Sequence, residues 1–500
     1  MKNGTLLAAI DLGSNSFRLE ICRFNNGLFQ RYEYLKEAVR QGSGLDQDRN
    51  LSLASMEKGW ECLARFAEKL SGFDRSQVRA VATQTLREAR NAQLFLDKAH
   101  RILGFPIEVV SGREEARLIY QGVAHLLPPS DERRLVIDIG GRSTEFIIGQ
   151  NKNALQLESY RLGSVASSMK YFPHGEFTAL AFQKAEVAAK AILDEALPIF
   201  GKDAWDIAYG SSGTVSAVSE VLAQAGWPAD RVTKEGIAWL KTQLIRIGHI
   251  DKLKMDGLKE ERKSVIGGGL SVLAALLDLF SIEELMVTPG ALRHGVLYDL
   301  LDREDEAKDT RALTVSGLRR GFQADSAQAH RVSKIACEFL KKLQTHEEGS
   351  SEWTRLQKKL SWAAQLHEIG NVISHTDSHK HGAYILENTD TPGFAKHELH
   401  RLSLLVLGHK GKLRKLDMDF EDEHLVYQLL SLRLAVILCH ARRDPEYSSL
   451  HLEKSKHIAR CFELSIEPLW AQRFPQSNHL LLQEAIAWQK TSWKVRITSA

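Results

Sequence analysis

The chain has 500 residues, with 66 Lys and Arg against 63 Asp and Glu, so its formal net charge is only +3. One hydrophobic core rarely supports that length, so we expect several domains. The proportions of hydrophobic (43%) and charged (26%) residues are typical of globular proteins and exclude a mainly disordered chain. The near balance of charge excludes a protein coated in basic residues, and we predict no nucleic-acid partner.

The cysteines and the apolar segments bear on the cellular compartment. The five cysteines are widely spaced and form no CxxC pair, so we expect neither a disulfide framework nor a zinc knuckle. No signal-peptide pattern precedes the first strand-like segment. The uncharged stretch 264–277 is shorter than the roughly 20 residues that a membrane span needs. We expect a soluble cytoplasmic protein without a transmembrane segment, with peripheral association at a membrane surface left open.

Two segments of the chain, residues 7–19 and residues 134–146, resemble each other. Each has an apolar run that ends in Asp, a glycine turn with a Ser, and a second run with alternating apolar positions. This pattern predicts a β-hairpin with glycine at its tip. The two segments lie about one domain length apart, so we expect two similar domains, each opening with such a hairpin.

Helix and strand patterns alternate after each hairpin, which is typical of α/β organisation. After the first hairpin we expect a helix over 56–70, a strand over 78–83, a helix over 94–103, a strand over 107–110 and a helix from about 112. After the second we expect a helix over 184–197, a strand over 206–209, a helix after 213 and a strand over 284–287.

The pattern of apolar and polar residues changes at the charged stretch 302–310, which we interpret as a linker. Beyond it, apolar residues recur at helical spacing over 332–343 and 356–366, and strand-like pieces return only at 461–466 and 494–497. Fourteen of the 19 histidines lie at or after His330. We therefore predict two α/β domains, a helical domain and a small α+β domain. Their predicted bounds are 1–120, 121–302, 311–408 and 409–500.

The two hairpins predict a phosphate site that contains a metal ion. A glycine turn lets backbone N–H groups converge on an anion, and the Asp at the end of each first strand would point into the same space. Carboxylates beside a phosphate need a divalent cation between them, or act as a base for water. For one hairpin alone, an ordinary turn with Asp as turn former is the simpler interpretation, and the repeat favours a functional one.

Two further loops, residues 208–214 and 288–293, each join a strand to a helix. The free N–H groups at a helix N-terminus bind phosphate, although neither loop has the GK[ST] of a Walker motif. Arg293 in the second loop could reach a phosphate. Taken alone, each such loop is more often a plain strand–helix turn.

Residues 109–117 place two adjacent carboxylates at a helix start. Ser111 and Glu114 fit the S-x-x-E pattern of a capping box, which gives Glu114 a structural role. Glu115 points about 100° away around the helix. It is either a general base that activates water for attack on phosphorus or a solvated helix charge.

Together these motifs resemble those of the exopolyphosphatase / guanosine pentaphosphate phosphohydrolase family, and most of all an exopolyphosphatase. The resemblance rests on residues 11–16, 85–87, 111–117, 136–141, 210–214 and 290–293. It implies an α/β fold of two actin-like (ribonuclease H-like) domains, then a helical degenerate HD-like domain and a small α+β C-terminal domain. It also implies a homodimer.

The resemblance further implies roles for single residues. Glu115 corresponds to the catalytic base, and Asp138 and Glu145 lie at the site of Mg²⁺ or another divalent cation. The phosphate-binding candidates are Asp11, Gly13, Ser14, Asn15, Arg87, Gly140, Gly141, Arg142, Ser143, Gly210, Ser211, Ser212, Gly213, Thr214 and Arg293. Two positions depart from the family pattern: Arg142 replaces a small residue, and His294 replaces a Glu. Arg142 either adds a phosphate contact or points outward.

The helical region resembles an HD-type phosphohydrolase domain that has lost its metal site. His330 and His367 stand where metal ligands are expected, but Glu368 replaces the Asp and residues 432–436 offer no late Asp ligand. We therefore expect a non-catalytic domain. Residues 409–415 form a basic run, either a solvated loop or part of a polyphosphate channel. The channel candidates are His381, His409, Lys410, Lys412, Arg414 and Lys415.

On this basis we expect a phosphoric anhydride hydrolase, an exopolyphosphatase that removes terminal phosphate processively from inorganic polyphosphate. Conversion of pppGpp to ppGpp is the first alternative, because it uses the same site chemistry. An actin-like nucleotide-binding protein or kinase, and a catalytically weak regulatory protein, are the others.

Overall fold

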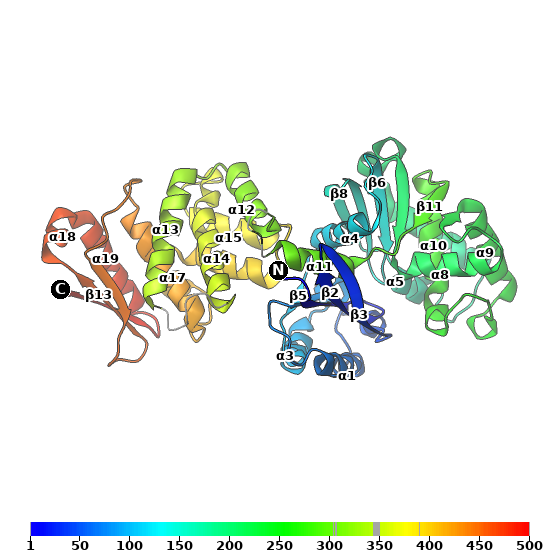
Figure 1. Ribbon diagram of the computed structural model, residues 1–500, viewed down its shortest axis with the longest axis horizontal. Helices are drawn as coiled ribbons and strands as arrows, with labels where there is room; N and C mark the ends of the chain where they lie inside the picture. The colour runs from blue at the N-terminus through cyan, green and yellow to red at the C-terminus, as the bar shows by residue number, and fades with distance from the viewer. Residues whose placement is uncertain (1, 304, 306–307, 344–350, 390, 500) are drawn as a thin grey trace. The chain divides into compact units, whose positions relative to one another are not determined.

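The computed structural model describes residues 2–303, 305, 308–343, 351–389 and 391–499. The chain divides into two compact units (Figure 1). The first unit consists of Met1–Asp309 and Asp390–Ala395, and the second of Thr310–Thr389 and Lys396–Ala500. The division falls within the predicted linker. The finer division into four domains stays a prediction.

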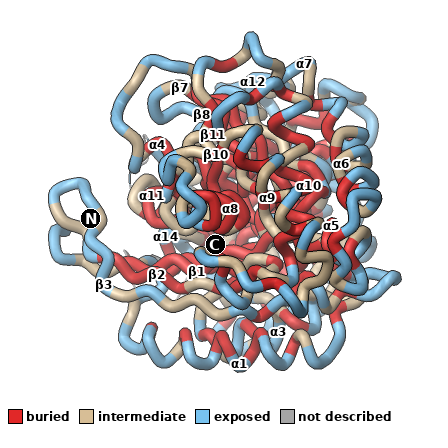
Figure 2. The backbone as a smooth tube through the Cα atoms, turned by 90° about the vertical axis from the view of Figure 1, so that its right-hand side faces the viewer, coloured by how far each residue is buried: buried red, intermediate tan, exposed pale blue. Residues whose placement is uncertain are grey.

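The first unit opens with a five-stranded mixed sheet of order β3-β2-β1-β4-β5. Its strands are β1 (Leu6–Leu12), β2 (Phe17–Asn25), β3 (Leu28–Glu37), β4 (Val78–Ala82) and β5 (Ile107–Val109). Strands β1 and β2 form the predicted hairpin, and β4 and β5 join in parallel. One face packs on α1 (Leu53–Lys69) and α3 (Ala92–Leu103), and Figure 2 shows β1 buried along its length.

A second mixed sheet has the order β10-β11-β9-β6-β7-β8. Its strands are β6 (Arg133–Ile139), β7 (Thr144–Gln150), β8 (Asn153–Tyr160), β9 (Ile207–Ser211), β10 (Arg231–Thr233) and β11 (Glu284–Val287). Apart from the edge strand β10, the order β8-β7-β6-β9-β11 repeats that of the first sheet. The sequence repeat therefore corresponds to a repeat of topology, and the predicted mixed α/β organisation is confirmed.

Two helices lie between the sheets, α4 (Gly112–Leu126) and α11 (Leu292–Asp302). Their apolar side chains share one cluster with Leu7 and Ala9 of β1 and with Val136 and Ile147 of the second sheet. Strand β1 is buried on both faces because alternate side chains reach α1 and α3 on one side and α4 on the other (Figure 1). The start of α4 is thereby fixed between the two repeated halves.

Further helices cover the other face of the second sheet. They include α5 (Ser164–Tyr171), α6 (Ala179–Leu193), α7 (Leu197–Phe200), α8 (Ser212–Gln224), α9 (Lys234–Ile247) and α10 (Lys263–Leu279), while α2 (Gln84–Glu88) follows β4. The helix predicted over 184–197 starts five residues earlier and ends at Leu193. It ends there because Pro198 lacks an N–H group, which favours the first turn of a new helix, here α7.

The second unit is mainly helical. Its helices are α12 (Thr310–Gly321), α13 (Ser326–Leu343), α14 (Ser351–Leu366), α15 (Ser378–Asn388), α16 (Lys396–Gly408), α17 (Glu423–Leu438), α18 (Pro468–Arg473) and α19 (Pro475–Trp488). A small sheet has the order β12-β13-β14, with β12 (Leu450–Lys454), β13 (Cys461–Ile466) and β14 (Lys494–Ser499). Strand β12 was not predicted, because only Leu450 and Leu452 carry its apolar pattern. That the helical part is HD-like stays a prediction.

The cysteines and helices agree with two exclusions made from the sequence. All five cysteines are free, so no disulfide framework is present. Burial raises the pKa of the Cys22 thiol to about 12, as expected for a small buried side chain. Among the described residues, no helix is long and apolar enough to cross a membrane.

Candidate functional site

The tips of the two repeated hairpins meet. A Cβ atom added at Gly141 would lie 2.9 Å from the Cβ atom of Ser14, so only glycine permits this approach. Ser14 is held in turn by the Thr85 hydroxyl, which donates to its Oγ at 2.7 Å. The two predicted phosphate turns therefore form one surface.

This surface lines a pocket of about 330 Å³ in the first unit. Both hairpin tips, the start of α8, the start of α11 and side chains of β3 contribute to its walls. The predicted site residues in the lining are Asp11, Gly13, Ser14, Asn15, Glu115, Asp138, Gly140, Gly141, Ser143, Ser212, Gly213, Thr214 and Arg293. The fold thus brings together residues from five separate segments of sequence.

Four predicted phosphate ligands lie outside the lining: Arg87, which is described with Glu115 below, and Arg142, Gly210 and Ser211. Arg142 turns away, pairs with Glu88 at 2.9 Å and donates to the Gly42 carbonyl at 3.0 Å. Its side chain is largely covered there, so it neither lines the pocket nor extends into solvent. Ser211 donates to the Gly290 carbonyl at 2.7 Å, and Gly210 packs against Leu285.

The two hairpins differ in the residue that faces each Asp across the strand pair. In the first hairpin Asp11 faces Arg18, and their side chains form an ion pair at 2.9 Å. In the second, Asp138 faces Glu145, which is only 1% exposed. Side chains of directly opposed residues lie on the same face of a sheet. The second hairpin therefore carries two neighbouring carboxyl groups, Glu145 buried and Asp138 half-buried, and neither forms an ion pair with a described Lys or Arg.

The pKa values reflect this crowding. Burial, Glu115 and Asp138 raise the pKa of Glu145 well above its usual range. Burial also raises the pKa of Asp138 to about 6, although the charge of Arg18 opposes the rise. Oxygen ligands from adjacent carboxylates are what Mg²⁺ prefers, and such an ion would relieve the repulsion. The donor set fits a divalent cation, but the described residues hold no ready-made cluster of three metal-binding side chains.

Glu115 lies at the start of α4, on the wall of the pocket. Ser111 is the N-cap, and its Oγ accepts from the Glu114 N–H at 3.2 Å. The predicted capping box is only half formed, because the Glu114 side chain is bound to Arg117 instead of returning to Ser111. Glu115 is 7% exposed, and its Oε2 accepts from Arg87 Nη1 at 2.7 Å.

Glu115 has the properties of a general base near neutral pH. Burial raises its pKa to about 7, Arg87 opposes the rise, and the nearby charges of Asp11 and Asp138 add to it. When the pKa of a base lies close to the working pH, a large fraction of it is unprotonated and that fraction still binds a proton well. Arg87 is held by Gln84 and by the Val110 carbonyl, at 3.0 and 2.9 Å. It lies behind Glu115 rather than in the pocket lining.

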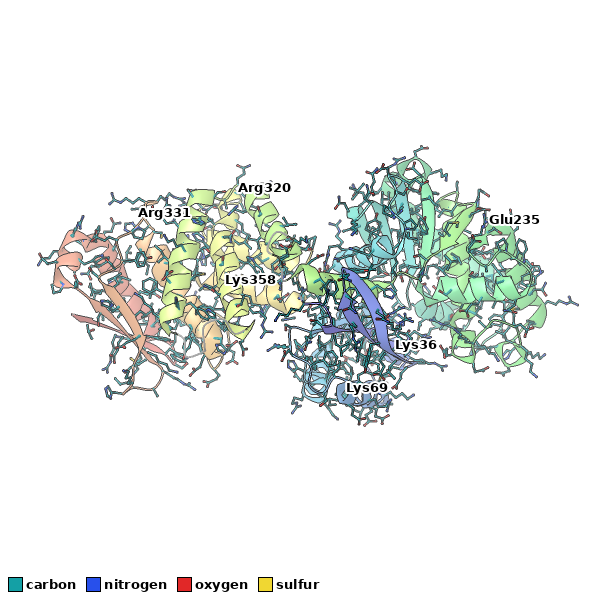
Figure 3. The ribbon with its side chains drawn as sticks, viewed as in Figure 1. Lys36, Lys69, Glu235, Arg320, Arg331 and Lys358 are labelled. Atoms are coloured by element: carbon teal, nitrogen blue, oxygen red, sulfur yellow. The ribbon has the colours of Figure 1, made fainter. Side chains whose placement is uncertain are left out.

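Sequence reasoning missed four cations in the lining: Arg18, Lys36 (Figure 3), Lys259 and Arg262. Arg262 is 8% exposed and forms no ion pair with any residue that the structure describes. Its guanidinium lies over the first turn of α8, where a Cβ atom on Gly213 would be 1.8 Å from its Nη2. Residues 259–263 have the pattern of a solvated charge run, which does not indicate that Arg262 is buried.

The first turn of α8 is arranged for anion binding. Ser212 has φ +88°, in the left-handed region, and its Oγ accepts from the Thr214 N–H at 3.1 Å. Non-glycine residues adopt such angles at a cost, and they often occur at functional sites. Arg262 supplies a buried positive charge to the same turn. Helix N-termini with such a cation favour phosphate groups.

Arg293 lines the pocket, but its charge is partly neutralised. Its Nε is bound to Glu20 Oε2, and its guanidinium lies 5.4 Å from the centre of the Tyr34 ring. His294, the departure from the family pattern, places Nε2 at 3.5 Å from the same carboxylate. Burial would raise the pKa of Glu20, but the hydrogen bond from His294 and the charge of Arg293 outweigh it and lower this pKa to about 2.

The predicted channel residues all belong to the second unit. Lys410, Lys412, Arg414 and Lys415 are exposed. His409 is buried, and its Nδ1 is hydrogen-bonded to the Val406 carbonyl at 2.6 Å. Burial and the neighbouring His367 lower the pKa of His409 well below its usual range. His409 is therefore a neutral core residue and not part of an exposed basic surface, while His381 is half-buried.

Comparison with known proteins gives consistent matches over the whole chain. A model of the Ppx/GppA phosphatase family matches residues 21–304, and a model of domain III of Ppx/GppA phosphatases matches residues 310–485. Guanosine-5'-triphosphate,3'-diphosphate pyrophosphatase of Pseudoalteromonas translucida (strain TAC 125) is 37% identical over 491 residues. The match covers 98% of this chain and 97% of that protein.

Solved structures resemble the first part of the chain. An exopolyphosphatase from Cytophaga hutchinsonii is 24% identical, with a TM-score of 0.54, and covers 60% of this chain and 98% of its own. The Ppx/GppA family member of Aquifex aeolicus is 24% identical, with a TM-score of 0.50, and covers 60% of this chain and 99% of its own. These likenesses show that the chain shares its fold with these proteins over the matched part.

Proposed function

Because the chain belongs to the Ppx/GppA phosphatase family, we propose that it removes the terminal phosphate of guanosine-5'-triphosphate,3'-diphosphate. The observation that carries this proposal is the buried Glu115, whose pKa is raised to about 7 at the wall of a pocket built from phosphate-binding turns. The substrate class is supported by the relative of that name, which is 37% identical across nearly the whole chain. The expected exopolyphosphatase activity becomes the second candidate.

In the proposed reaction Glu115 accepts a proton from water as the water oxygen forms a bond to the terminal phosphorus. The anhydride P–O bond to the leaving diphosphate breaks, and orthophosphate departs. Arg87 holds the Glu115 carboxylate toward the pocket and keeps its pKa from rising further. Such transfers need positioning and charge stabilisation more than covalent chemistry.

The phosphate chain itself would be held by the lining. Residues of the hairpin tips and of the α8 start, together with Arg262 and Arg18, line the space it would occupy. Mg²⁺, held by Asp138 and Glu145, would offset the charge of the phosphate oxygens. Asn15 has a buried Nδ2 without a hydrogen-bond acceptor among the described residues, and a phosphate oxygen would satisfy it.

Polyphosphate is kept as a second candidate because of the exposed basic run in the second unit. Lys410, Lys412, Arg414 and Lys415 are exposed within six residues of sequence. A linear polyanion longer than the pocket would gain from such a surface, whereas a nucleotide would not need it. The actin-like kinase and regulatory alternatives have no such observation in their favour.

The proposed function is tested by offering purified protein with Mg²⁺ three substrates in turn: pppGpp, long-chain polyphosphate and ATP. Release of orthophosphate is measured for each. We expect the highest kcat/KM with pppGpp, and loss of turnover in Glu115→Gln. A surface variant, Glu235→Gln (Figure 3), is the matched control. A preference for polyphosphate would establish the second candidate, and turnover of ATP alone would contradict both.

A further inference from the structure

A short segment from the second half of the chain forms part of the first unit. Residues 391–395, called here the insert segment, lie between α15 and α16 in sequence but cluster with the first unit. Thr391, Phe394 and Ala395 in it are buried. The insert segment is therefore part of the folded body that contains the pocket, not a solvated connection.

The insert segment binds the residues immediately before and within the first turn of α4. The Gly393 N–H donates to Glu114 Oε2 at 2.7 Å, and Ala395 forms an isolated antiparallel bridge with Val110. Arg303 donates to the Gly393 carbonyl at 3.2 Å. Gly393 has φ +86°, which is in the region that favours glycine. The segment thus contacts both the strand end and the helix start that flank Ser111.

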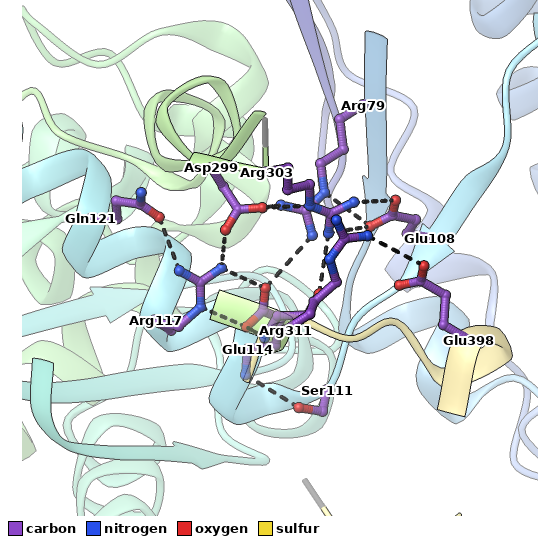
Figure 4. A network of polar contacts seen from close by, with 11 residues as sticks. Arg79, Glu108, Ser111, Glu114, Arg117, Gln121, Asp299, Arg303, Arg311 and Glu398 are labelled. Atoms are coloured by element: carbon purple, nitrogen blue, oxygen red, sulfur yellow. Dashed lines mark hydrogen bonds and ion pairs between the residues drawn. The ribbon is translucent and has the colours of Figure 1, made fainter. Parts of the chain in front are cut away.

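Glu114 is the point at which the segment joins a buried ionic network (Figure 4). Arg117 binds Glu114 at 2.8 Å and Asp299 at 2.5 Å, and Glu114 is 0% exposed. Arg79 binds Glu108 at 2.9 Å and Asp299 at 2.6 Å. Arg303 is the third arginine, and it pairs with Glu108 and Asp299. These three arginines face three carboxylates, so their charges balance. A buried network of this kind holds its members in one arrangement.

The same contacts lead to Glu115 in one further step. Val110, the bridge partner of Ala395, accepts from Arg87 Nη1 at 2.9 Å through its carbonyl. That same Nη1 donates to Glu115 Oε2 at 2.7 Å. Glu114 and Glu115 are consecutive on α4, so fixing the direction of one carboxylate fixes the rotation of the helix start that carries the other.

We infer that the insert segment is a positioning element for Glu115 and Arg87, acting through Glu114 and Val110. This inference rests on the proposed function, because it assigns the segment to the same site. Gly393 touches neither substrate nor reacting atoms, so it is a positioning residue. The second half of the chain thereby contributes to the orientation of the base through five residues.

The test compares three variants of the full chain. Gly393→Pro removes the N–H donor and cannot adopt the positive φ. Gly248→Pro is the matched control, because Gly248 also has a positive φ (78°) and an N–H that donates to a helix carbonyl, but lies outside the pocket lining and the network. Gly393→Asn is the conservative variant, since Asn keeps the N–H and tolerates this conformation. Steady-state kinetics and hydrogen exchange of residues 110–116 are measured.

We expect Gly393→Pro to lower kcat by about tenfold or more with KM within about twofold, because misplacing a catalytic group costs turnover rather than binding. Amides of residues 110–116 should exchange faster in this variant, while Gly248→Pro changes neither property and Gly393→Asn restores both. Unchanged kcat and exchange in Gly393→Pro, or the same changes in Gly248→Pro, would overturn the inference. If the wild type releases no phosphate from either candidate substrate, the proposed function fails, and exchange of residues 110–116 alone decides the inference.

Discussion

Two consecutive residues on α4 have different environments and therefore different roles. Glu114 is fully buried among arginines and holds the helix in place, whereas Glu115 is buried beside one arginine and three carboxyl groups. The sequence indicated that the pair would divide in this way, since the helical period turns them about 100° apart. It did not indicate what binds Glu114, because Arg117 is near in sequence but Asp299 and Gly393 are not.

The pH dependence of turnover should report the protonation of Glu115. A base acts only when it is unprotonated, so kcat/KM should rise with pH through about 7, the pKa to which burial raises this carboxyl. Arg87→Met removes the charge that lowers this pKa, so the rising limb should move to higher pH. Arg90→Met, a change of the same type at an exposed arginine, is the control. A limb that stays in place in Arg87→Met would contradict the assignment.

Arg262 gives a prediction in which stability and binding change in opposite directions. Burial and the nearby Arg18 lower the pKa of its guanidinium, which means that its charged form is destabilised in the folded protein. Arg262→Gln should therefore leave the melting temperature unchanged or raise it. The same change should raise KM by about tenfold to a hundredfold, the range for a lost hydrogen bond to a charged group.

Thermal unfolding and steady-state kinetics of Arg262→Gln check both halves of this prediction. Arg246→Gln, at an exposed arginine of α9, is the control and should change neither quantity. A large loss of stability in Arg262→Gln, or an unaltered KM, would show that Arg262 is a structural cation rather than a phosphate ligand.

At the scale of elements, the hairpins and the strand–helix turns were predictable because their signals are local. An apolar run that ends in Asp and glycine predicts a hairpin from its own residues alone, and the sequence repeat indicates that two such hairpins occur. Arg142 and Arg262 were not predictable, because their positions depend on partners far away in sequence: Gly42 for the first and Gly213 for the second. Likewise, the bridge between Ala395 and Val110 spans most of the chain.

The strand pair β6–β7 predicts how a divalent cation affects stability. Burial raises the pKa of Asp138 to about 6 and that of Glu145 well above its usual range, so their protonated forms are favoured in the metal-free fold. Their contribution to stability is present at low pH and is lost as pH rises through these values. Mg²⁺ binds the ionised forms, so its stabilisation should be larger at pH 8 than at pH 5.

Melting temperatures with and without Mg²⁺ at the two pH values test this prediction. We expect an increase of about 2–4 °C at pH 8 and little at pH 5. Glu145→Gln removes one of the opposed charges, so the metal-free protein should become more stable at pH 8 and its response to Mg²⁺ should fall. Glu235→Gln should behave as the wild type. An equal response to Mg²⁺ in Glu145→Gln would exclude Glu145 from the cation site.

At the scale of the whole molecule, the two units allow the two candidate substrates to be separated. The pocket is lined only by residues of the first unit, and the exposed basic run belongs to the second. The sequence located this run but could not show that His409 is buried, because burial depends on packing against His367 and α16. The fold of the first unit was the most predictable part, since it combines a repeat with matching local patterns.

Charge reversal tests whether the basic run tracks a long polyanion. Lys412→Glu with Lys415→Glu should raise KM for long-chain polyphosphate and flatten its dependence on salt, since each lost phosphate contact lowers the salt slope by about 0.7–0.9. Lys456→Glu with Lys490→Glu reverses two exposed lysines elsewhere in the second unit and controls for net charge. If the two double variants have equal effects on KM and on its salt dependence, the basic run is a solvated loop that does not bind the polyanion.

The unequal facing residues of the two hairpins also give the pocket a polarity. The duplicated halves share strand order and turn length, so a bound anion would otherwise meet two equivalent walls. The halves differ at one equivalent position, which is Arg18 in the first hairpin and Glu145 in the second. Asp11 is therefore neutralised by an arginine, whereas Asp138 faces another carboxyl group. An anion in the pocket therefore lies between a hairpin whose Asp is already paired with an arginine and a hairpin whose Asp faces a second carboxyl group.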